Sequence, residues 1–179
     1  MHSILIDDFF EEIKACGVND NHKIIDLACG KGRNGLFLAK KGLPVIFADH
    51  SEGALQLVKS ALALAKNDGE IWSVNFEQND VNPLANKQFA VALVFRYLHR
   101  PLMPYLLASI SPGGLVIYET FTLENKQFGR PNRSEFLLKP GELKSYFSHW
   151  QVLHYFEGIL TKPDRVVAQI VCRKPAKLS

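Results

Sequence analysis

The stretch Asp26-Leu27-Ala28-Cys29-Gly30-Lys31-Gly32-Arg33-Asn34-Gly35 decides the fold. It follows an apolar run at 23–28 and leads into a segment of helical periodicity at 33–41. Glycines at such a strand-to-helix turn let the backbone pass close under a ligand at the carboxyl end of the strand. The stretch therefore predicts a nucleotide-like ligand at the first turn of an α/β sheet.

Outward from this turn, apolar runs of strand length alternate with longer amphipathic stretches, which is typical of a mainly parallel sheet covered by helices. The sequence predicts strands at 23–28, 45–48, within 71–78, at 89–95 and at 115–121. It predicts helices at 4–15, at 33–41, from a capping Ser51 to about 67, at 101–109 and at 140–147. Two closing runs, 150–156 and 165–172, are joined by a short connection and should form an antiparallel pair.

Length and composition set outer limits on the class of protein. At 179 residues and 47% hydrophobic, the chain is expected to form one domain over residues 1–179. No apolar run reaches the roughly 20 residues that span a bilayer, and the acidic N-terminal stretch is unlike a signal peptide, so a cytoplasmic protein without membrane contact is expected. Three dispersed cysteines and scattered histidines predict reduced thiols and no metal site. A net charge of +3, with acids and bases interleaved, argues against a nucleic-acid partner; a monomer or homodimer is expected.

Three acidic residues lie at the ends of three successive predicted strands. A carboxylate at Asp26 would repel a pyrophosphate but suits the ammonium of a methionine moiety. Asp49 lies where an acid can accept from ribose hydroxyls, and Asp80 can accept from an exocyclic adenine amine beside an apolar wall at Val81. Asp also often merely ends strands, and the glycines spell a dinucleotide fingerprint as well. A nicotinamide-dependent oxidoreductase therefore remains an alternative.

The run from Asp26 to Asn34, with Asp49-His50 after it, resembles the class I S-adenosylmethionine-dependent methyltransferases, in particular the small ones of the tellurite-resistance type. The resemblance implies an α/β Rossmann-like fold: a seven-stranded, mostly parallel sheet of order 3-2-1-4-5-7-6, an antiparallel last strand and helices on both faces. It implies an S-adenosylmethionine site that releases S-adenosylhomocysteine. The residues expected there are Asp26, Ala28, Gly30, Gly32, Arg33, Asn34, Asp49, His50, Asp80, Val81 and Phe95.

The acceptor is expected beyond the fourth predicted strand, where Phe95-Arg96-Tyr97-Leu98-His99-Arg100-Pro101 crowds donors and one possible base. Tyr97 and His99 are the candidate catalytic residues, and Arg96 is a candidate substrate-binding residue. Alternatively, Arg96 and Arg100 are solvated, Tyr97 packs in the core and His99 caps the next helix.

The segment Thr122–Lys139 is longer than the roughly 12 to 15 residues usual for structureless connections, so it is a candidate lid over the substrate. Arg130 and Arg133 could bind an anion there. The alternative is that these charges serve solubility, because Glu124 and Glu135 partly offset them.

Together these features predict an enzyme that transfers a methyl group from S-adenosylmethionine to a small-molecule acceptor. The resemblance suggests a soft nucleophile such as a thiol or a chalcogen anion, which needs no general base. Two alternatives remain: an RNA or protein methyltransferase, and a non-catalytic S-adenosylmethionine-binding module. The chain lacks an Asn/Asp-Pro-Pro-Tyr/Phe motif and a Pro-Cys pair, which argues against adenine amino and cytosine C5 methylation.

Overall fold

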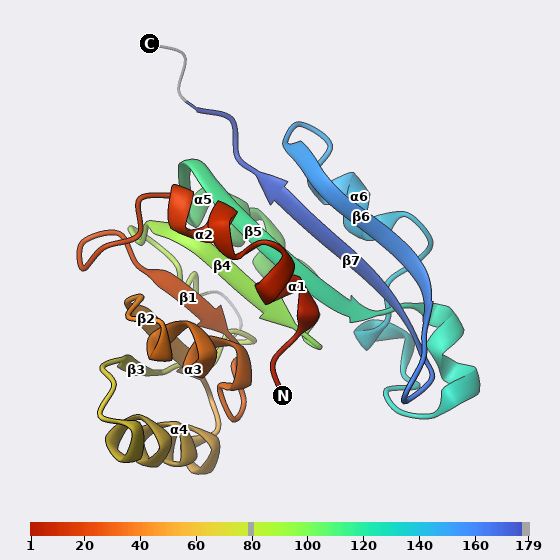
Figure 1. The fold of residues 1–179 in the computed structure, drawn as a ribbon. Helices are drawn as coiled ribbons and strands as arrows, with labels where there is room; N and C mark the ends of the chain where they lie inside the picture. The colour runs from red at the N-terminus through yellow and green to blue at the C-terminus, as the bar shows by residue number, and fades with distance from the viewer. Residues whose placement is uncertain (79–80, 177–179) are drawn as a thin grey trace.

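The structure is a computed structural model that describes residues 1–78 and 81–176. Within them, one sheet of seven strands runs in the order β3-β2-β1-β4-β5-β7-β6 (Figure 1). The strands are β1 (Ile24–Leu27), β2 (Val45–Asp49), β3 (Glu70–Ser73), β4 (Phe89–Phe95), β5 (Ile110–Phe121), β6 (Gln151–Leu160) and β7 (Arg165–Arg173). β7 pairs antiparallel with both β5 and β6, and the other pairings are parallel. The predicted strand order and reversed strand are confirmed.

The centre of the sheet is buried on both faces. All four residues of β1 and most of β4 are buried, as expected for parallel strands covered by helices on either side. Because β1, β2, β4 and β5 run parallel, their carboxyl ends lie along one edge of the sheet. The residues that follow these strands are therefore gathered at that edge, which we call the carboxyl edge.

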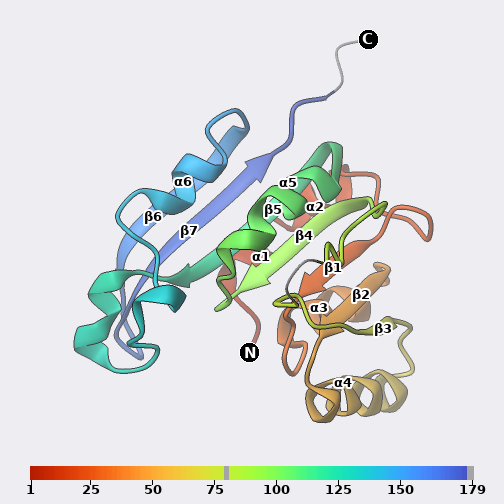
Figure 2. The same ribbon diagram turned by 180° about the vertical axis from the view of Figure 1, so that it is seen from behind.

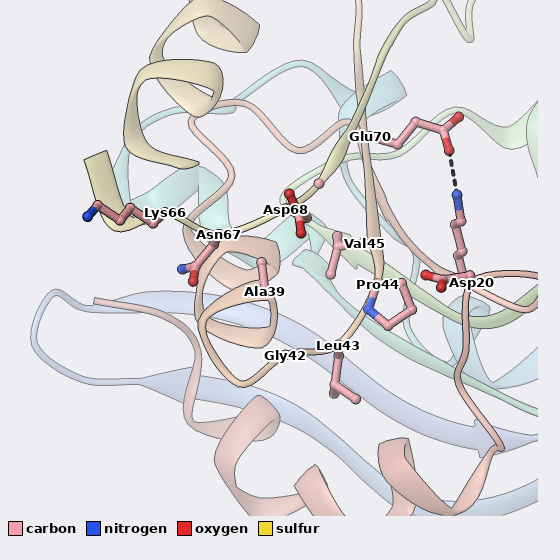
Figure 3. Close-up of a pocket in the computed structure, with 12 residues that line it drawn as sticks. Asp20, Ala39, Gly42, Leu43, Pro44, Val45, Lys66, Asn67, Asp68 and Glu70 are labelled. Atoms are coloured by element: carbon pink, nitrogen blue, oxygen red, sulfur yellow. Dashed lines mark hydrogen bonds and ion pairs between the residues drawn. The ribbon is translucent and has the colours of Figure 1, made fainter. Parts of the chain in front are cut away.

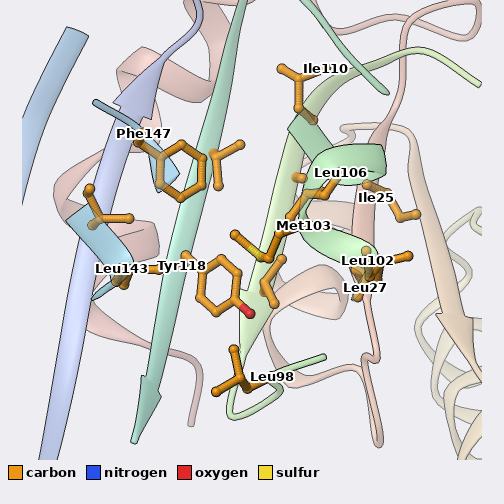
Figure 4. Packing of buried hydrophobic residues seen from close by; sticks show 14 of the residues in the cluster. Ile25, Leu27, Leu98, Leu102, Met103, Leu106, Ile110, Tyr118, Leu143 and Phe147 are labelled. Atoms are coloured by element: carbon orange, nitrogen blue, oxygen red, sulfur yellow. The ribbon is translucent and has the colours of Figure 1, made fainter. Parts of the chain in front are cut away.

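Helices cover both faces, as predicted (Figures 1 and 2). They are α1 (Ile4–Asp8), α2 (Phe10–Ala15), α3 (Arg33–Lys40), α4 (Glu52–Ala65), α5 (Met103–Ser109) and α6 (Glu142–Tyr146). Side chains of α1 to α4 share a buried cluster with one face of the sheet, and those of α5 and α6 share another with the opposite face. In Figure 4, Met103 and Leu106 of α5 pack near Tyr118 of β5, with Leu143 and Phe147 on its other side.

Several predicted elements have different boundaries. The opening helix at 4–15 is two helices, because Phe9 leaves helical geometry with φ −113° and ψ 22°. The third strand covers only Glu70–Ser73 rather than much of 71–78. A 3₁₀ turn over Arg100–Leu102 precedes α5, and the predicted helix at 140–147 is the five-residue α6. None of the helices in the described ranges is long and apolar enough to cross a membrane.

β5 begins five residues earlier than predicted. Ile110 pairs with Phe89, and the ladder then shifts register before Leu115 pairs with Val91. A Cβ at Gly114 would lie 2.6 Å from the carbonyl oxygen of Ala90, so a side chain at 114 would collide with the neighbouring strand. Residues 110–114, which lay outside the predicted strand at 115–121, are thus an irregular part of β5.

The segment 122–139 forms a loop closed at its base. The Leu123 amide donates to the Leu138 carbonyl at 2.9 Å, and the Leu138 amide donates to the Phe121 carbonyl at 2.9 Å. The loop contains 3₁₀ turns at Leu123–Phe128 and Ser134–Phe136, so it is less irregular than predicted. We call residues 122–139 the base-closed loop.

Candidate functional site

The turn after β1 places its backbone against β2 and leaves one side open. The Cys29 amide donates to the Ala48 carbonyl at 3.1 Å. Ala28 and Gly30 have positive φ angles of 51° and 54°. A Cβ at Gly30 would meet nothing within 4 Å, so the backbone is open on that side to a ligand.

Two buried carboxylates hold this turn. Asp26 accepts from the Gly35 amide at 2.9 Å, and Asp49 accepts from the amides of Gly30 at 2.7 Å and Ser51 at 2.8 Å. Burial raises the pKa of Asp26 to about 7, against the lowering effects of the Gly35 amide and the charge of Arg33. Each carboxylate oxygen can accept two hydrogen bonds, so Asp26 and Asp49 retain acceptor capacity for a ligand.

The glycines of the turn after β1 have two different surroundings: some leave room for a ligand, and others allow close packing of α3. A Cβ at Gly32 would lie 2.8 Å from Val58, and one at Gly35 would lie 2.5 Å from the ring of Phe47. Gly32 and Gly35 therefore permit α3 to approach β2 and α4. Gly32 was also predicted to hold the ligand; the side where its Cβ would stand faces this packing contact, and its contact to a ligand stays a prediction.

A cavity of about 320 Å³ opens at the carboxyl end of β1. Its lining contains seven of the predicted cofactor- and substrate-binding residues together with Cys29 and Lys31: Asp26, Ala28, Cys29, Gly30, Lys31, Arg33, Asn34, Phe95 and Arg96. Burial raises the pKa of the Cys29 thiol, and the charges of Asp26 and Asp49 raise it further. The thiol is therefore neutral and unsuited to act as a nucleophile.

Asn34 has a second contact, and the predicted cofactor residues His50 and Val81 lie outside the cavity at β1. The side-chain oxygen of Asn34 accepts from the Ser3 amide at 2.9 Å, so this amide ties the N-terminal segment to α3 while lining the cavity. The His50 side chain is 78% exposed and lies 3.6 Å from the Asp49 carboxylate. Val81 is half-exposed in a second cavity. Asp80 lies outside the described residues.

The two candidate catalytic residues are not brought together in one cavity. The Tyr97 hydroxyl is buried, has no hydrogen-bond partner among residues 1–78 and 81–176, and its ring packs beside the α5 and α6 cluster. Burial and the negative charge of Glu77 raise the pKa of Tyr97. His99 instead lines the second cavity, with Val81, and does not cap the following turn through its side chain.

Three arginines gather at the carboxyl edge. Partial burial lowers the pKa of Arg96, the positive charges of Arg33 and Arg165 lower it further, and Glu119 opposes this. The Arg165 Nε atom is buried without a hydrogen-bond partner within the described ranges. Arg165 was missed in the sequence, although the antiparallel direction of β7 places its first residue at the carboxyl edge.

The loop arginines lie in a separate cavity. Arg130 and Arg133 line about 520 Å³ of space with Phe136, and none of these residues lines the cavity at β1. Arg133 forms an ion pair with Glu135 and lies 5.3 Å from the centre of the Phe136 ring. Glu135 thus offsets the positive charge of Arg133, as the solubility alternative for this loop predicts.

Arg100 is only partly exposed and is held by protein partners, unlike the solvated arginine considered from the sequence. Its guanidinium donates to both carboxylate oxygens of Glu142, at 2.6 and 2.9 Å. It also donates to the carbonyls of Glu135 at 2.9 Å and Leu137 at 2.8 Å. Its partners are about 40 residues away in sequence, which is why local pattern did not reveal them.

A further cavity, of about 570 Å³, lies at the opposite edge of the sheet (Figure 3). It borders the amino ends of β2 and β3, where Val45 and Glu70 are found, and Glu70 pairs with Lys23 at 3.0 Å. None of the predicted site residues lines it. The chemistry-bearing residues therefore concentrate at the carboxyl edge, where ligands of open α/β sheets bind.

Comparison with known proteins gives a family match over nearly the whole chain. The family model described as "Tellurite resistance protein TehB" matches residues 5–173. A Haemophilus influenzae protein named "Probable S-adenosyl-L-methionine-dependent methyltransferase TehB" is 29% identical over 149 residues, which are 79% of this chain and 51% of that protein. The chain spans about half the length of the curated relatives it matches.

Solved structures with the same fold include the crystal structure of TehB from Haemophilus influenzae. It superposes with a TM-score of 0.71 at 21% identity, over 92% of this chain and 62% of that one. The magnesium protoporphyrin IX methyltransferase of Synechocystis, solved with bound S-adenosylhomocysteine, superposes with a TM-score of 0.66 at 13% identity over 95% of this chain and 81% of that one. At these identities the likeness establishes the fold.

Proposed function

The chain belongs to the TehB family of tellurite resistance proteins, and from that premise we propose that it is an S-adenosylmethionine-dependent methyltransferase. The name of the Haemophilus influenzae relative supports this activity. The observation that carries the proposal is the cavity at the carboxyl end of β1, where the open Gly30 backbone lies beside the buried carboxylate of Asp26.

The residues of this cavity, together with Asp49 next to its Gly30, fit an aminoacyl nucleoside. Asp26 offers a carboxylate to an ammonium group, and Asp49 retains acceptor capacity for ribose hydroxyls. Phe95 and Ala28 give the cavity apolar surface, which helps to exclude water. A pyrophosphate in the same place would meet the Asp26 charge, which argues against the oxidoreductase alternative. When bound, S-adenosylmethionine supplies an electrophilic methyl group on a positively charged sulfur.

Calorimetric titration tests this cofactor assignment. We expect S-adenosylmethionine and S-adenosylhomocysteine to bind the purified chain and NADH not to bind. Asp49→Ala should weaken nucleoside binding about 10- to 100-fold, because it removes an acceptor and releases the Gly30 amide. Asp68→Ala, in the cavity at the opposite edge, is the matched control and should leave the affinity unchanged. Binding of NADH alone would overturn the assignment.

The acceptor we propose is a small anion such as a thiolate or a chalcogen oxyanion. Arg33, Arg96 and Arg165 repel one another, and an anion among them would relieve that repulsion. A nucleophile that is already anionic has no proton to lose. Burial and the negative charge of Glu77 raise the pKa of Tyr97, so its phenol is not suited to remove a proton from an acceptor.

Kinetics with an acceptor from a screen of thiols and chalcogen oxyanions test this anion site. Arg96→Ala should raise the acceptor KM about 10-fold or more, with little change in the KM for S-adenosylmethionine, because a charge-assisted contact is lost. Arg130→Ala and Arg133→Ala should raise the same KM if the base-closed loop also contacts the anion. An unchanged KM would remove these two residues from the substrate site. Turnover with any acceptor also eliminates the non-catalytic binding module.

A further inference from the structure

We propose that Arg100 is a positioning residue that joins the base-closed loop to the segment carrying Tyr97 and His99, so that both hold one position on the acceptor side of the site. This proposal rests on the proposed function, which identifies the acceptor side of the site. It goes beyond the proposed function by assigning a role to Arg100 and Glu142.

The Arg100 guanidinium makes four hydrogen bonds to one short stretch of chain. Two reach the Glu142 carboxylate in a bidentate arrangement, and two reach the carbonyls of Glu135 and Leu137. These carbonyls lie on the returning half of the base-closed loop. Only the planar, five-donor guanidinium can serve a carboxylate and two separate carbonyls at once, whereas a lysine ammonium offers a single point of charge.

Glu142 is held from several directions. Its carboxylate also accepts from the Lys139 amide at 2.8 Å and from the Tyr146 hydroxyl at 3.0 Å. Burial acts to raise the pKa of Glu142, but the hydrogen bonds from Arg100, Lys139 and Tyr146 together hold it below its usual range. The carboxylate therefore stays ionised and links the end of the loop and the start of α6 to Arg100.

The other end of the connection is the turn after β4. Arg100 directly follows His99 and stands three residues after Tyr97. The Tyr97 carbonyl accepts from the buried Tyr118 hydroxyl at 2.8 Å, which fixes this turn to β5. On its far side, the loop is tied to β7, because the Asn125 side chain accepts from the Val166 amide at 3.0 Å. Val166 is next to Arg165, so this hydrogen bond joins the loop to the strand that carries Arg165.

Hydrogen exchange of the full chain, saturated with S-adenosylhomocysteine, tests the connection. Arg100→Lys should speed amide exchange at least 10-fold both in residues 134–139 and in residues 96–102. Arg173→Lys is the matched control, because Arg173 donates to the Gly113 carbonyl at the opposite edge. It should leave both segments unchanged. The proposal is overturned if Arg100→Lys affects only one segment, or neither, or if Arg173→Lys produces the same pattern.

Kinetics separate positioning from a general loss of folded enzyme. With potassium tellurite as acceptor, Arg100→Lys should raise the acceptor KM at least 5-fold at an unchanged KM for S-adenosylmethionine. A purely structural defect would lower kcat in proportion to the folded fraction and leave both KM values alone, which would contradict the proposal. If the wild-type chain does not methylate tellurite, tellurite alone is excluded as the acceptor, while the exchange experiment still decides on Arg100.

Discussion

Asp26→Asn should weaken S-adenosylmethionine binding about 100-fold and, at the same time, stabilise the unliganded protein. The binding loss follows because a carboxylate facing an ammonium group contributes more than a neutral amide. The gain in stability follows because Asp26 is almost fully buried and its charge is poorly solvated. An asparagine can still accept from the Gly35 amide, so the turn should keep its geometry.

The pH dependence fixes the sign of the stability effect. Burial raises the pKa of Asp26 from 3.8 to about 7, so the folded protein holds a proton that the unfolded chain has released. The free energy of unfolding therefore falls as pH rises from about 4 to about 7. Above about pH 7, this pKa shift corresponds to a loss of roughly 4 kcal/mol in the free energy of unfolding. Asp26→Asn should remove this slope and raise Tm above neutral pH by on the order of 10 °C.

Two measurements check this prediction. Thermal unfolding of the wild type and Asp26→Asn across about pH 4 to pH 8 should give curves that agree at the acidic end and separate above it. Calorimetry between about pH 5.5 and pH 7.5 should show wild-type affinity for S-adenosylmethionine increasing with pH, and none of this increase in Asp26→Asn. Equal Tm values at neutral pH would show that the Asp26 charge is not costly.

Gly35→Ala should destabilise the fold by about 3 kcal/mol, because overpacking of a filled core displaces side chains and backbone. The added methyl would lie 2.5 Å from the Phe47 ring and 2.8 Å from the Asp26 carboxylate. Phe47 is fully buried, so its ring has no free space to move into. Urea unfolding gives the difference directly as a lower midpoint at an unchanged slope.

Gly53→Ala is the matched control for this substitution. Gly53 lies in the first turn of α4, as Gly35 lies in the first turn of α3, and a Cβ there would meet nothing within 4 Å. Alanine is the better helix former, so Gly53→Ala should be neutral or should stabilise the protein by up to about 1 kcal/mol. A stability loss of similar size in both variants would mean that crowding at Gly35 is not the cause.

The local chemistry of the chain made much of the fold predictable. Short apolar runs separated by amphipathic stretches predicted the strands, and the resemblance to class I methyltransferases implied their order, which is confirmed. The predicted cap of α4 is also confirmed, since Ser51 accepts from the Ala54 amide at 3.3 Å. The glycine-rich turn and the Asp26 carboxylate were also predicted at one site, and both line its cavity. In each case the determining residues are neighbours in sequence.

What could not be predicted depends on residues far apart in sequence. Arg100 has no local pattern that distinguishes it from a solvated arginine, because its partners are in the loop and α6. Gly30 and Gly32 have different surroundings: a Cβ at Gly30 would face open space, and a Cβ at Gly32 would face Val58. Both surroundings depend on the folded chain. The break at Phe9 interrupts the continuous helical periodicity of 4–15 at a residue whose side chain packs against the buried cluster.

The hydrogen bond from the Gly30 amide to Asp49 has a thermodynamic consequence for ligand recognition. It fixes the turn in the unliganded protein, so the conformational entropy of these residues, about 1–2 kcal/mol each, is lost during folding rather than on ligand association. A nucleoside entering the cavity then loses mainly its own freedom of motion. Substitutions that loosen the turn should therefore weaken affinity even where no contact to the nucleoside is removed.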